Sequence, residues 1–185
     1  MELYRQAQDE FDKVLAAVSS GWDTSSTCAG WTVRDVAGHA IWGQHQLRAW
    51  ATGGPNPSPA GAPGAPHPAV LTAEDPLATW RAARTAADAV LTPQTLTRTT
   101  TIPGMGEVPV VAVVELLTCD LTTHAWDIGH PLGQTVRLPD PLVAASHAWA
   151  RAHLVRAPGF FGPELTPPTD ADAQTRMLAF LGRAA

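Results

Sequence analysis

Cysteine, lysine and long apolar runs are all scarce in this sequence. The two cysteines, Cys28 and Cys119, are too few for a disulfide framework, and the N-terminus lacks a signal-peptide core, so we expect a reduced, cytoplasmic protein. Lys13 is the sole lysine, and the scattered basic residues of a chain with net charge -5 argue against a nucleic-acid partner. The most apolar stretch, VPVVAVVELLTCDL, is interrupted by Glu115 and Asp120, which excludes a membrane span.

The spacing of apolar residues predicts a helical protein. With 185 residues and 45% hydrophobic composition, the chain can bury one core, so we expect residues 1–185 to form a single domain. Residues 53–70 are too rich in proline and glycine for a helix or strand and predict a mobile loop or lid. A short hairpin is expected around Pro103 and Gly104. Apolar steps of three and four predict helices at about 2–19, 33–50, 75–91, 109–128, 141–156 and 170–182.

The second predicted helix has a well-marked start. Thr32 is placed to cap it, and Asp35 can reach back to the Thr32 amide in a capping box. Trp31 and Val36 flank this start as a hydrophobic staple. The register of this helix is therefore defined from its first turn, and it turns His39 inward.

An acidic residue and a histidine lie one helical turn apart in the apolar helix predicted at 109–128. Asp120 and His124 fall on or beside its buried stripe, where an ionised carboxylate is costly unless it is paired or binds a metal. Together with His39 they form a candidate three-ligand set for zinc, or for nickel or iron, with one coordination position open. A hydrogen-bonded core histidine beside a chance Asp-x-x-x-His pair is the alternative explanation.

Other polar and aromatic residues have two interpretations each. Asp127 either orients the His124 imidazole or makes a local hydrogen bond near the helix end. Trp42 and Trp126 are core residues or walls of a substrate cleft. Cys28 would have a lowered pKa if exposed before the helix start, but packing is the simpler role, as it is for Cys119. The histidines not expected to be ligands are His45, His130, His147 and His153.

Two motifs resemble a known superfamily. CAGWTVRDVAGH at 28–39 and DLTTHAWDIGHPLG at 120–133 are similar to the DinB-like superfamily, and more closely to its branch related to the metal-binding domain of mycothiol-dependent maleylpyruvate isomerase. The tail FFGPELTPPTDADAQTRMLAFLGR resembles the ending of short members of that branch. The resemblance implies a DinB-like four-helix bundle with a small hairpin insertion and extra C-terminal helices. It also implies that His39, Asp120 and His124 bind a divalent metal, usually zinc.

The resemblance also suggests a type of reaction. It implies a metal-dependent enzyme on which a low-molecular-weight thiol such as mycothiol attacks an electrophilic small molecule, as in a thiol S-transferase. Asp120 stands where the isomerase has glutamate, and the isomerase has a second catalytic domain, so isomerase activity itself is not implied. Metal-activated water or Lewis acid chemistry, in hydrolysis, ring opening or cyclisation, is one alternative. A non-catalytic, metal-stabilised binding module is another. A homodimer is a further expectation, because such bundles often pair through exposed helix faces.

Overall fold

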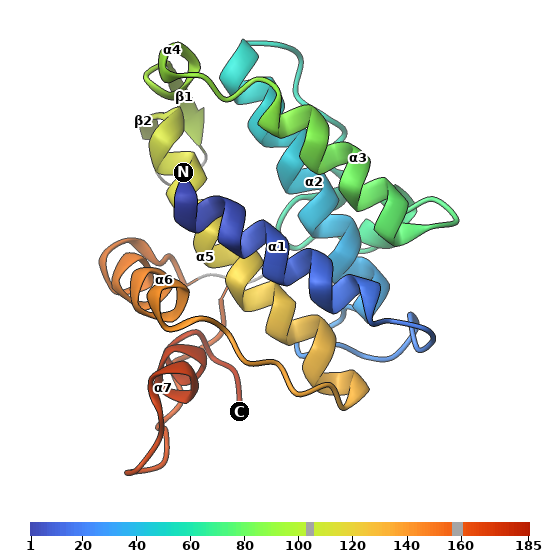
Figure 1. The fold of residues 1–185 in the computed structure, drawn as a ribbon, viewed down its shortest axis with the longest axis vertical. Helices are drawn as coiled ribbons and strands as arrows, with labels where there is room; N and C mark the ends of the chain where they lie inside the picture. The colour runs from blue at the N-terminus through green and yellow to red at the C-terminus, as the bar shows by residue number, and fades with distance from the viewer. Residues whose placement is uncertain (103–105, 157–160) are drawn as a thin grey trace.

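Four long helices pack side by side in a bundle (Figure 1). The computed structural model describes residues 1–102, 106–156 and 161–185. Within the bundle α1 contacts α3 and α5, and α2 contacts the same two helices. The four helices are α1 (Glu2–Ala16), α2 (Val33–Thr52), α3 (Pro76–Asp88) and α5 (Val110–Gly129). This arrangement confirms the predicted all-α bundle, with helix ends that differ from the predicted ones by a few residues.

The central element of the molecule is α5. It contacts α1, α2 and α6, which explains why it is apolar around most of its circumference. The hydroxyl groups of its buried threonines have hydrogen-bond partners within the helix: Thr118 and Thr122 each donate to the backbone carbonyl four residues earlier. Polar side chains are therefore tolerated inside this helix when they have a partner. Within the described residues, no helix combines the length and apolarity needed to cross a membrane.

The start of α2 has the predicted capping box. The Thr32 hydroxyl accepts from the Asp35 backbone N–H at 3.2 Å, and the Asp35 Oδ2 accepts from the Thr32 N–H at 2.9 Å. The other Asp35 oxygen accepts from the Ala69 N–H at 3.0 Å. One carboxylate thus both begins the helix and holds the following loop against it.

The loop that follows α2 lies against that helix. It contains two short 3-10 helices, η1 (Pro59–Gly61) and η2 (Pro68–Leu71), and neither α-helix nor strand, as its proline and glycine content predicts. Both contact α2. A Cβ atom at Gly38 would lie 2.0 Å from the Pro68 carbonyl oxygen, and a Cβ at Gly61 would lie 2.2 Å from the Trp42 Cβ. These two glycines allow the loop backbone to lie directly on α2 beside His39.

A short hairpin precedes α5, as predicted. Strands β1 (Thr99–Ile102) and β2 (Gly106–Pro109) pair antiparallel, with Ile102 opposite Gly106. The turn residues expected at its tip, Pro103 and Gly104, lie outside the described residues. A single helical turn that the sequence analysis did not predict, α4 (Pro93–Leu96), comes before the hairpin and is capped by the Thr92 side chain.

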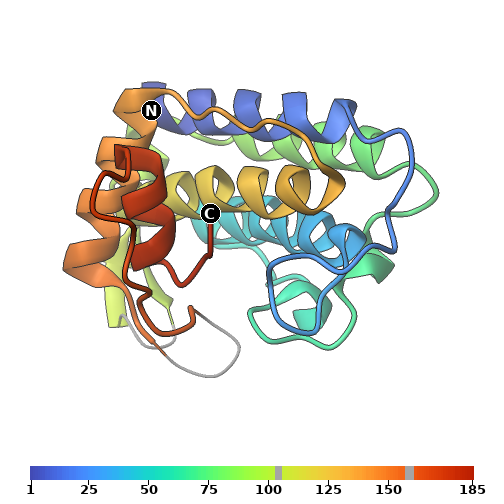
Figure 2. The same ribbon diagram turned by 90° about the horizontal axis from the view of Figure 1, so that it is seen from below.

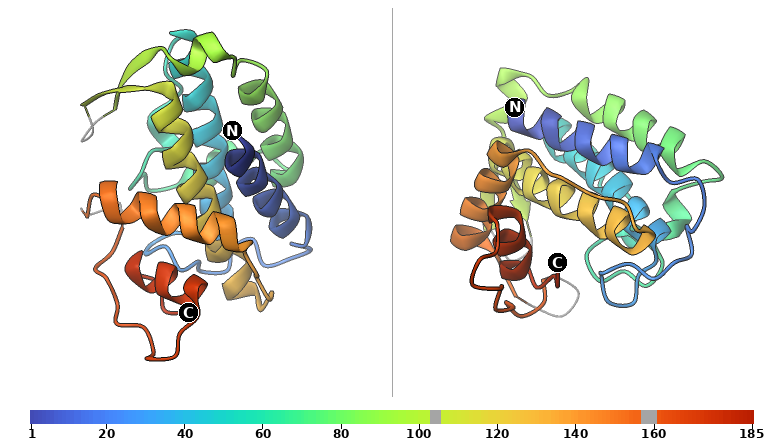
Figure 3. Two further views of the ribbon diagram at one scale, coloured as in Figure 1. Left: turned by 60° about the vertical axis from the view of Figure 1, so that its left-hand side comes forward. Right: turned by 60° about the horizontal axis from the view of Figure 1, so that its bottom comes forward.

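The C-terminal helices cover one end and one side of the bundle (Figure 2). α6 (Asp140–His153) packs on α5, and α7 (Ala173–Phe180) packs on α6. α7 starts later than predicted because Asp172 is its cap, accepting from the Thr175 backbone N–H at 2.7 Å. Figure 3 shows that α6 and α7 do not extend the bundle but cross it, and that the chain returns toward α5 after α7.

Candidate metal centre

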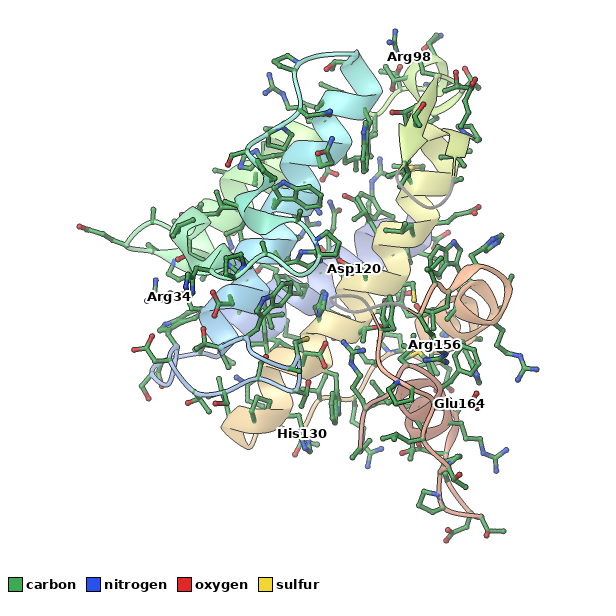
Figure 4. The ribbon with its side chains drawn as sticks, turned by 180° about the vertical axis from the view of Figure 1, so that it is seen from behind. Arg34, Arg98, Asp120, His130, Arg156 and Glu164 are labelled. Carbon is green, nitrogen blue, oxygen red and sulfur yellow. The ribbon has the colours of Figure 1, made fainter. Side chains whose placement is uncertain are left out.

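The packing of α2 against α5 brings the three predicted ligands together. His39 on α2 and His124 on α5 are 7% and 5% exposed, and the Asp120 side chain between them is 15% exposed. His39 Nε2 lies 3.7 Å from Asp120 Oδ2, and His124 Nε2 lies 3.3 Å from Asp120 Oδ1. Figure 4 shows Asp120 in the middle of the molecule, between the two helices.

Each imidazole is oriented by a hydrogen bond from its other ring nitrogen. His39 Nδ1 lies 2.6 Å from the Gly61 carbonyl oxygen, and His124 Nδ1 lies 2.8 Å from Asp127 Oδ2. Because a carbonyl and a carboxylate only accept, both Nδ1 atoms carry the proton and donate it. Both Nε2 atoms therefore face Asp120, the arrangement in which a metal-binding histidine is usually held.

The distances and charges suit a divalent cation. Ligand atoms about 2.1 Å from a tetrahedral zinc ion lie about 3.4 Å from one another, and each Nε2 atom lies at a similar distance, 3.7 or 3.3 Å, from one of the two Asp120 oxygens. Burial raises the pKa of Asp120, but the charges of His124 and His39 outweigh burial and hold this pKa far below its usual range. Burial lowers the pKa of His124, but Asp120 and Asp127 outweigh it and raise that pKa. The ionised carboxylate therefore favours a proton on the His124 imidazole, and a metal ion bound to that imidazole would replace this proton.

Aromatic rings surround His39. The Trp31 ring centroid lies 5.1 Å from that of His39, and the Trp42 ring is stacked 6.0 Å away on the same imidazole. Trp42 donates its indole N–H to the Ser58 carbonyl, which attaches the ring to the loop. Trp126, for which the sequence left core or cleft wall open, is buried and stacks on His130 at the end of α5. The indoles beside His39 are thus those of Trp31 and Trp42.

Asp127 is completely buried and has several partners. It accepts from His124, from the Thr27 hydroxyl, and from the Arg183 guanidinium through Nε at 3.1 Å and Nη2 at 2.8 Å. Burial raises the pKa of Asp127, but the charge of Arg183 and the hydrogen bonds from His124 and Arg183 outweigh it and lower that pKa. The orienting contact predicted for Asp127 is present, but Arg183 is a partner that the sequence did not indicate.

Cys28 also lies beside the ligand histidine. Its Sγ is 3.3 Å from Asp127 Oδ2 and 3.9 Å from His124 Nδ1. Burial and the Asp127 charge raise the pKa of this thiol, opposite to the shift expected if Cys28 were exposed. Cys28, His124 and Asp127 are close enough to form a second possible ligand set. Since the His124 Nδ1 proton is donated to Asp127 and the thiol is kept neutral, we interpret these three residues as a hydrogen-bonded cluster.

The remaining histidines do not join the centre. Among the described residues, the possible ligand sets include His39 and His124 and no other histidine. His45 and His153 are exposed, and His130 packs on Trp126. His147 lies near Phe180, with 5.5 Å between the ring centroids. These four histidines therefore lie outside the candidate ligand sets of the described residues.

Comparison with known proteins places the chain in a family. Residues 4–129 match the model of the mycothiol maleylpyruvate isomerase N-terminal domain. The uncharacterized proteins MT0763 and Rv0738, from two strains of Mycobacterium tuberculosis, are 32% identical over 97% of this chain and 95% of their own length. A crystal structure of a point mutant of mycothiol-dependent maleylpyruvate isomerase has the same fold, with a TM-score of 0.58 and 16% identity.

The structural match and the family match cover different shares of the chain. The structural match covers 78% of this chain and 65% of the isomerase chain, so this protein spans about two thirds of the length of that enzyme. At 16% identity the isomerase shares the fold, and its activity does not transfer by itself. The family model, in contrast, covers more than half of the chain, including His39, Asp120 and His124. The chain therefore belongs to the family of the mycothiol maleylpyruvate isomerase N-terminal domain, in the DinB-like superfamily.

Proposed function

We propose that this protein is a metal-dependent enzyme that activates a low-molecular-weight thiol for reaction with an electrophilic small molecule. His39, Asp120 and His124 would hold the metal, and zinc suits two imidazoles and one carboxylate. The observation that carries the proposal is the convergence of two Nε2 atoms on one ionised carboxylate, while both Nδ1 protons are donated elsewhere.

The charge of the site favours an anionic ligand. Asp127 is paired with Arg183, so when both imidazoles are neutral metal ligands Asp120 is the carboxylate left to balance the charge of a bound ion. A divalent ion bound there would keep one net positive charge and would stabilise a thiol as its thiolate at neutral pH. The protein's own residues orient the two imidazoles and limit the access of water to them. The nearby indoles of Trp31 and Trp42 provide an apolar surface for the substrate.

Mycothiol is the proposed thiol because it appears in the name of the family to which the chain belongs. The structure also indicates the size of the electrophile. The buried ligands and the loop that lies against α2 suit a small organic molecule rather than a polymer, since η1 and η2 cover the helix on which His39 lies. The two loops expected to shape specificity are residues 53–70 and residues 157–169, and residues 157–160 of the second loop lie outside the described residues.

The first test is the metal content of tag-free protein. We expect about one zinc per chain in the wild type, and its loss in His124→Ala and Asp120→Ala. His45→Ala is the matched control, because His45 lies on α2 like His39 but is exposed and outside the ligand set. A wild type that contains no metal and does not take up added zinc would overturn the proposal.

The second test concerns the thiol. Zinc-loaded wild type is incubated with an electrophile such as monobromobimane and with mycothiol, cysteine or glutathione, and conjugate formation is followed by fluorescence. The proposal expects acceleration with at least one thiol and none in Asp120→Ala. Turnover of a substrate without any thiol would favour the alternative in which the metal activates water or acts as a Lewis acid. A bound metal without turnover under either condition would favour a binding module.

A further inference from the structure

The side chain of Arg183 lies in the interior, although the residue is third from the C-terminus. It is 8% exposed and forms a two-point contact with Asp127, through Nε to Oδ1 and Nη2 to Oδ2. Its Nη1 donates to the Leu181 carbonyl at 2.7 Å, and Nη2 lies 3.6 Å from the Cys28 Sγ. The guanidinium carbon also lies 5.2 Å from the centroid of the Phe161 ring. All polar groups of this side chain are thus engaged inside the protein.

The end of α7 explains how Arg183 reaches this position. Gly182 has a φ of 82°, a left-handed conformation that reverses the chain at the helix end. The Arg183 backbone N–H then donates to the Leu178 carbonyl at 2.8 Å, which is the contact of a Schellman motif. Met177, Leu178 and Leu181 are fully buried, so the short helix is attached firmly to the rest of the protein.

Asp127 connects Arg183 to a predicted metal ligand. Its Oδ2 accepts from both Arg183 Nη2 and His124 Nδ1, each at 2.8 Å. A two-point guanidinium contact fixes the plane of a carboxylate, which a single hydrogen bond does not. Because that plane determines the direction in which Oδ2 accepts, Arg183 also constrains the His124 ring and the direction of its Nε2.

We propose that Arg183 is a positioning residue of the metal centre, acting on His124 through Asp127. This inference rests on the proposed metal site. Arg183 lies outside residues 4–129, the part that matches the family domain, so the centre also depends on the C-terminal segment. Partners that orient metal-bound histidines typically change metal affinity by 10- to 100-fold when they are removed.

The test measures zinc affinity by competition with a chromophoric chelator. We expect Arg183→Met to weaken zinc binding by roughly 10- to 100-fold and Arg183→Lys to recover part of the loss, because lysine restores the charge but not the two-point contact. Arg156→Met is the matched control. Arg156, labelled in Figure 4, also holds the C-terminal segment, donating to the Phe180 carbonyl at 2.7 Å and lying over the Phe180 ring. Its hydrogen bonds go to backbone carbonyls and not to Asp127.

Repeating the Arg183→Met substitution in an Asp127→Asn variant separates an effect on the orientation of His124 from a loss of folding. Removing Arg183 alone leaves a buried carboxylate without its counter-ion, which destabilises the protein. In Asp127→Asn the counter-ion is no longer needed, so Arg183→Met is introduced there as well. If Arg183 acts through Asp127, the double variant binds zinc within twofold of Asp127→Asn. The visible spectrum of the cobalt-substituted protein supplies a readout of ligand geometry: it should change in Arg183→Met and not in Arg156→Met.

The results distinguish this inference from the metal site itself. If the wild type binds zinc, His124→Ala does not, and Arg183→Met binds as tightly as the wild type with the same cobalt spectrum, then Arg183 has no positioning role and the centre remains. An equal loss in Arg183→Met and Arg156→Met would also overturn the inference, because the segment would then act only through stability. A wild type that binds no zinc overturns the proposed function and this inference together.

Discussion

Adding a single methyl group at Gly38 should lower both the stability of the protein and its affinity for zinc, because the loop after α2 lies directly on this glycine. A Cβ there would lie 2.0 Å from the Pro68 carbonyl oxygen, 2.4 Å from its carbon and 3.0 Å from the Ala69 nitrogen. These are backbone atoms, so a side-chain rotation cannot relieve the contact. In Gly38→Ala the η2 backbone must therefore move by roughly 1 Å, the kind of overpacking that costs about 1–3 kcal/mol.

The expected change in the free energy of unfolding of Gly38→Ala combines the cost of overpacking with a gain in helix propensity. Alanine in the interior of a helix is favoured over glycine by about 1 kcal/mol, which offsets part of the overpacking. Gly43→Ala provides the matched control on the same helix, because its Cβ would meet only the Leu117 Cδ2, at 3.3 Å, and a side chain can yield. We expect Gly38→Ala to be less stable than Gly43→Ala by about 1–3 kcal/mol, measured by urea unfolding of the metal-free proteins.

The same displacement should weaken metal binding. η2 contacts η1, whose Gly61 carbonyl holds His39 Nδ1 at 2.6 Å, so movement of η2 loosens the orientation of a predicted ligand. We expect a loss of zinc affinity of about tenfold or more in Gly38→Ala and wild-type affinity in Gly43→Ala. Equal stability and equal zinc affinity in the two variants would refute the reasoning, because the loop would then not lie against α2 as described.

Three further predictions concern the cap, the pH dependence and the metal. Thr32→Ala should lower the free energy of unfolding by about 1 kcal/mol, measured by urea unfolding; no change would contradict the capping box. Burial raises the pKa of Asp35, but hydrogen bonds from the Thr32 and Ala69 backbone N–H groups outweigh it and lower that pKa. Its contribution to stability is therefore complete above about pH 4, the pKa of an unfolded aspartate, and is lost as the pH falls through the lowered folded pKa. The stability difference between wild type and Asp35→Asn should be larger at pH 6 than at pH 3, and a difference independent of pH would contradict this assignment. Free zinc at a hundredfold its Kd should add about 2.7 kcal/mol to the free energy of unfolding, detected as a rise in Tm that is absent in His124→Ala; an equal rise in that variant would indicate binding elsewhere.

The sequence predicted the helices and helix faces on which the candidate ligands lie, because these depend on the spacing of nearby residues. Asp120 and His124 are four residues apart on one helix, so they share a face wherever the helix packs. The capping box at Thr32 set the register that turns His39 inward. These local signals nominated the three residues that the structure brings together, and the resemblance to the isomerase branch added the expectation that they bind a metal.

Other contacts at the site were not predicted because they join distant parts of the chain. The Gly61 carbonyl reaches His39 only because the loop lies on α2, and no sequence pattern marks one backbone carbonyl as an acceptor. Gly182 signals a chain reversal, but nothing in the sequence pairs Arg183 with Asp127, 56 residues earlier. For Trp126 the sequence left a core role and a cleft wall open, and the structure buries it against His130.

The sequence by itself thus determined which residues are the candidate ligands and on which helices they lie, because capping and helical periodicity are properties of short segments. Only the tertiary structure decided how those ligands are oriented. The direction of each imidazole depends on the acceptor that its Nδ1 proton finds, and both acceptors are placed by packing: the Gly61 carbonyl by the loop on α2, and the Asp127 carboxylate by the guanidinium of Arg183.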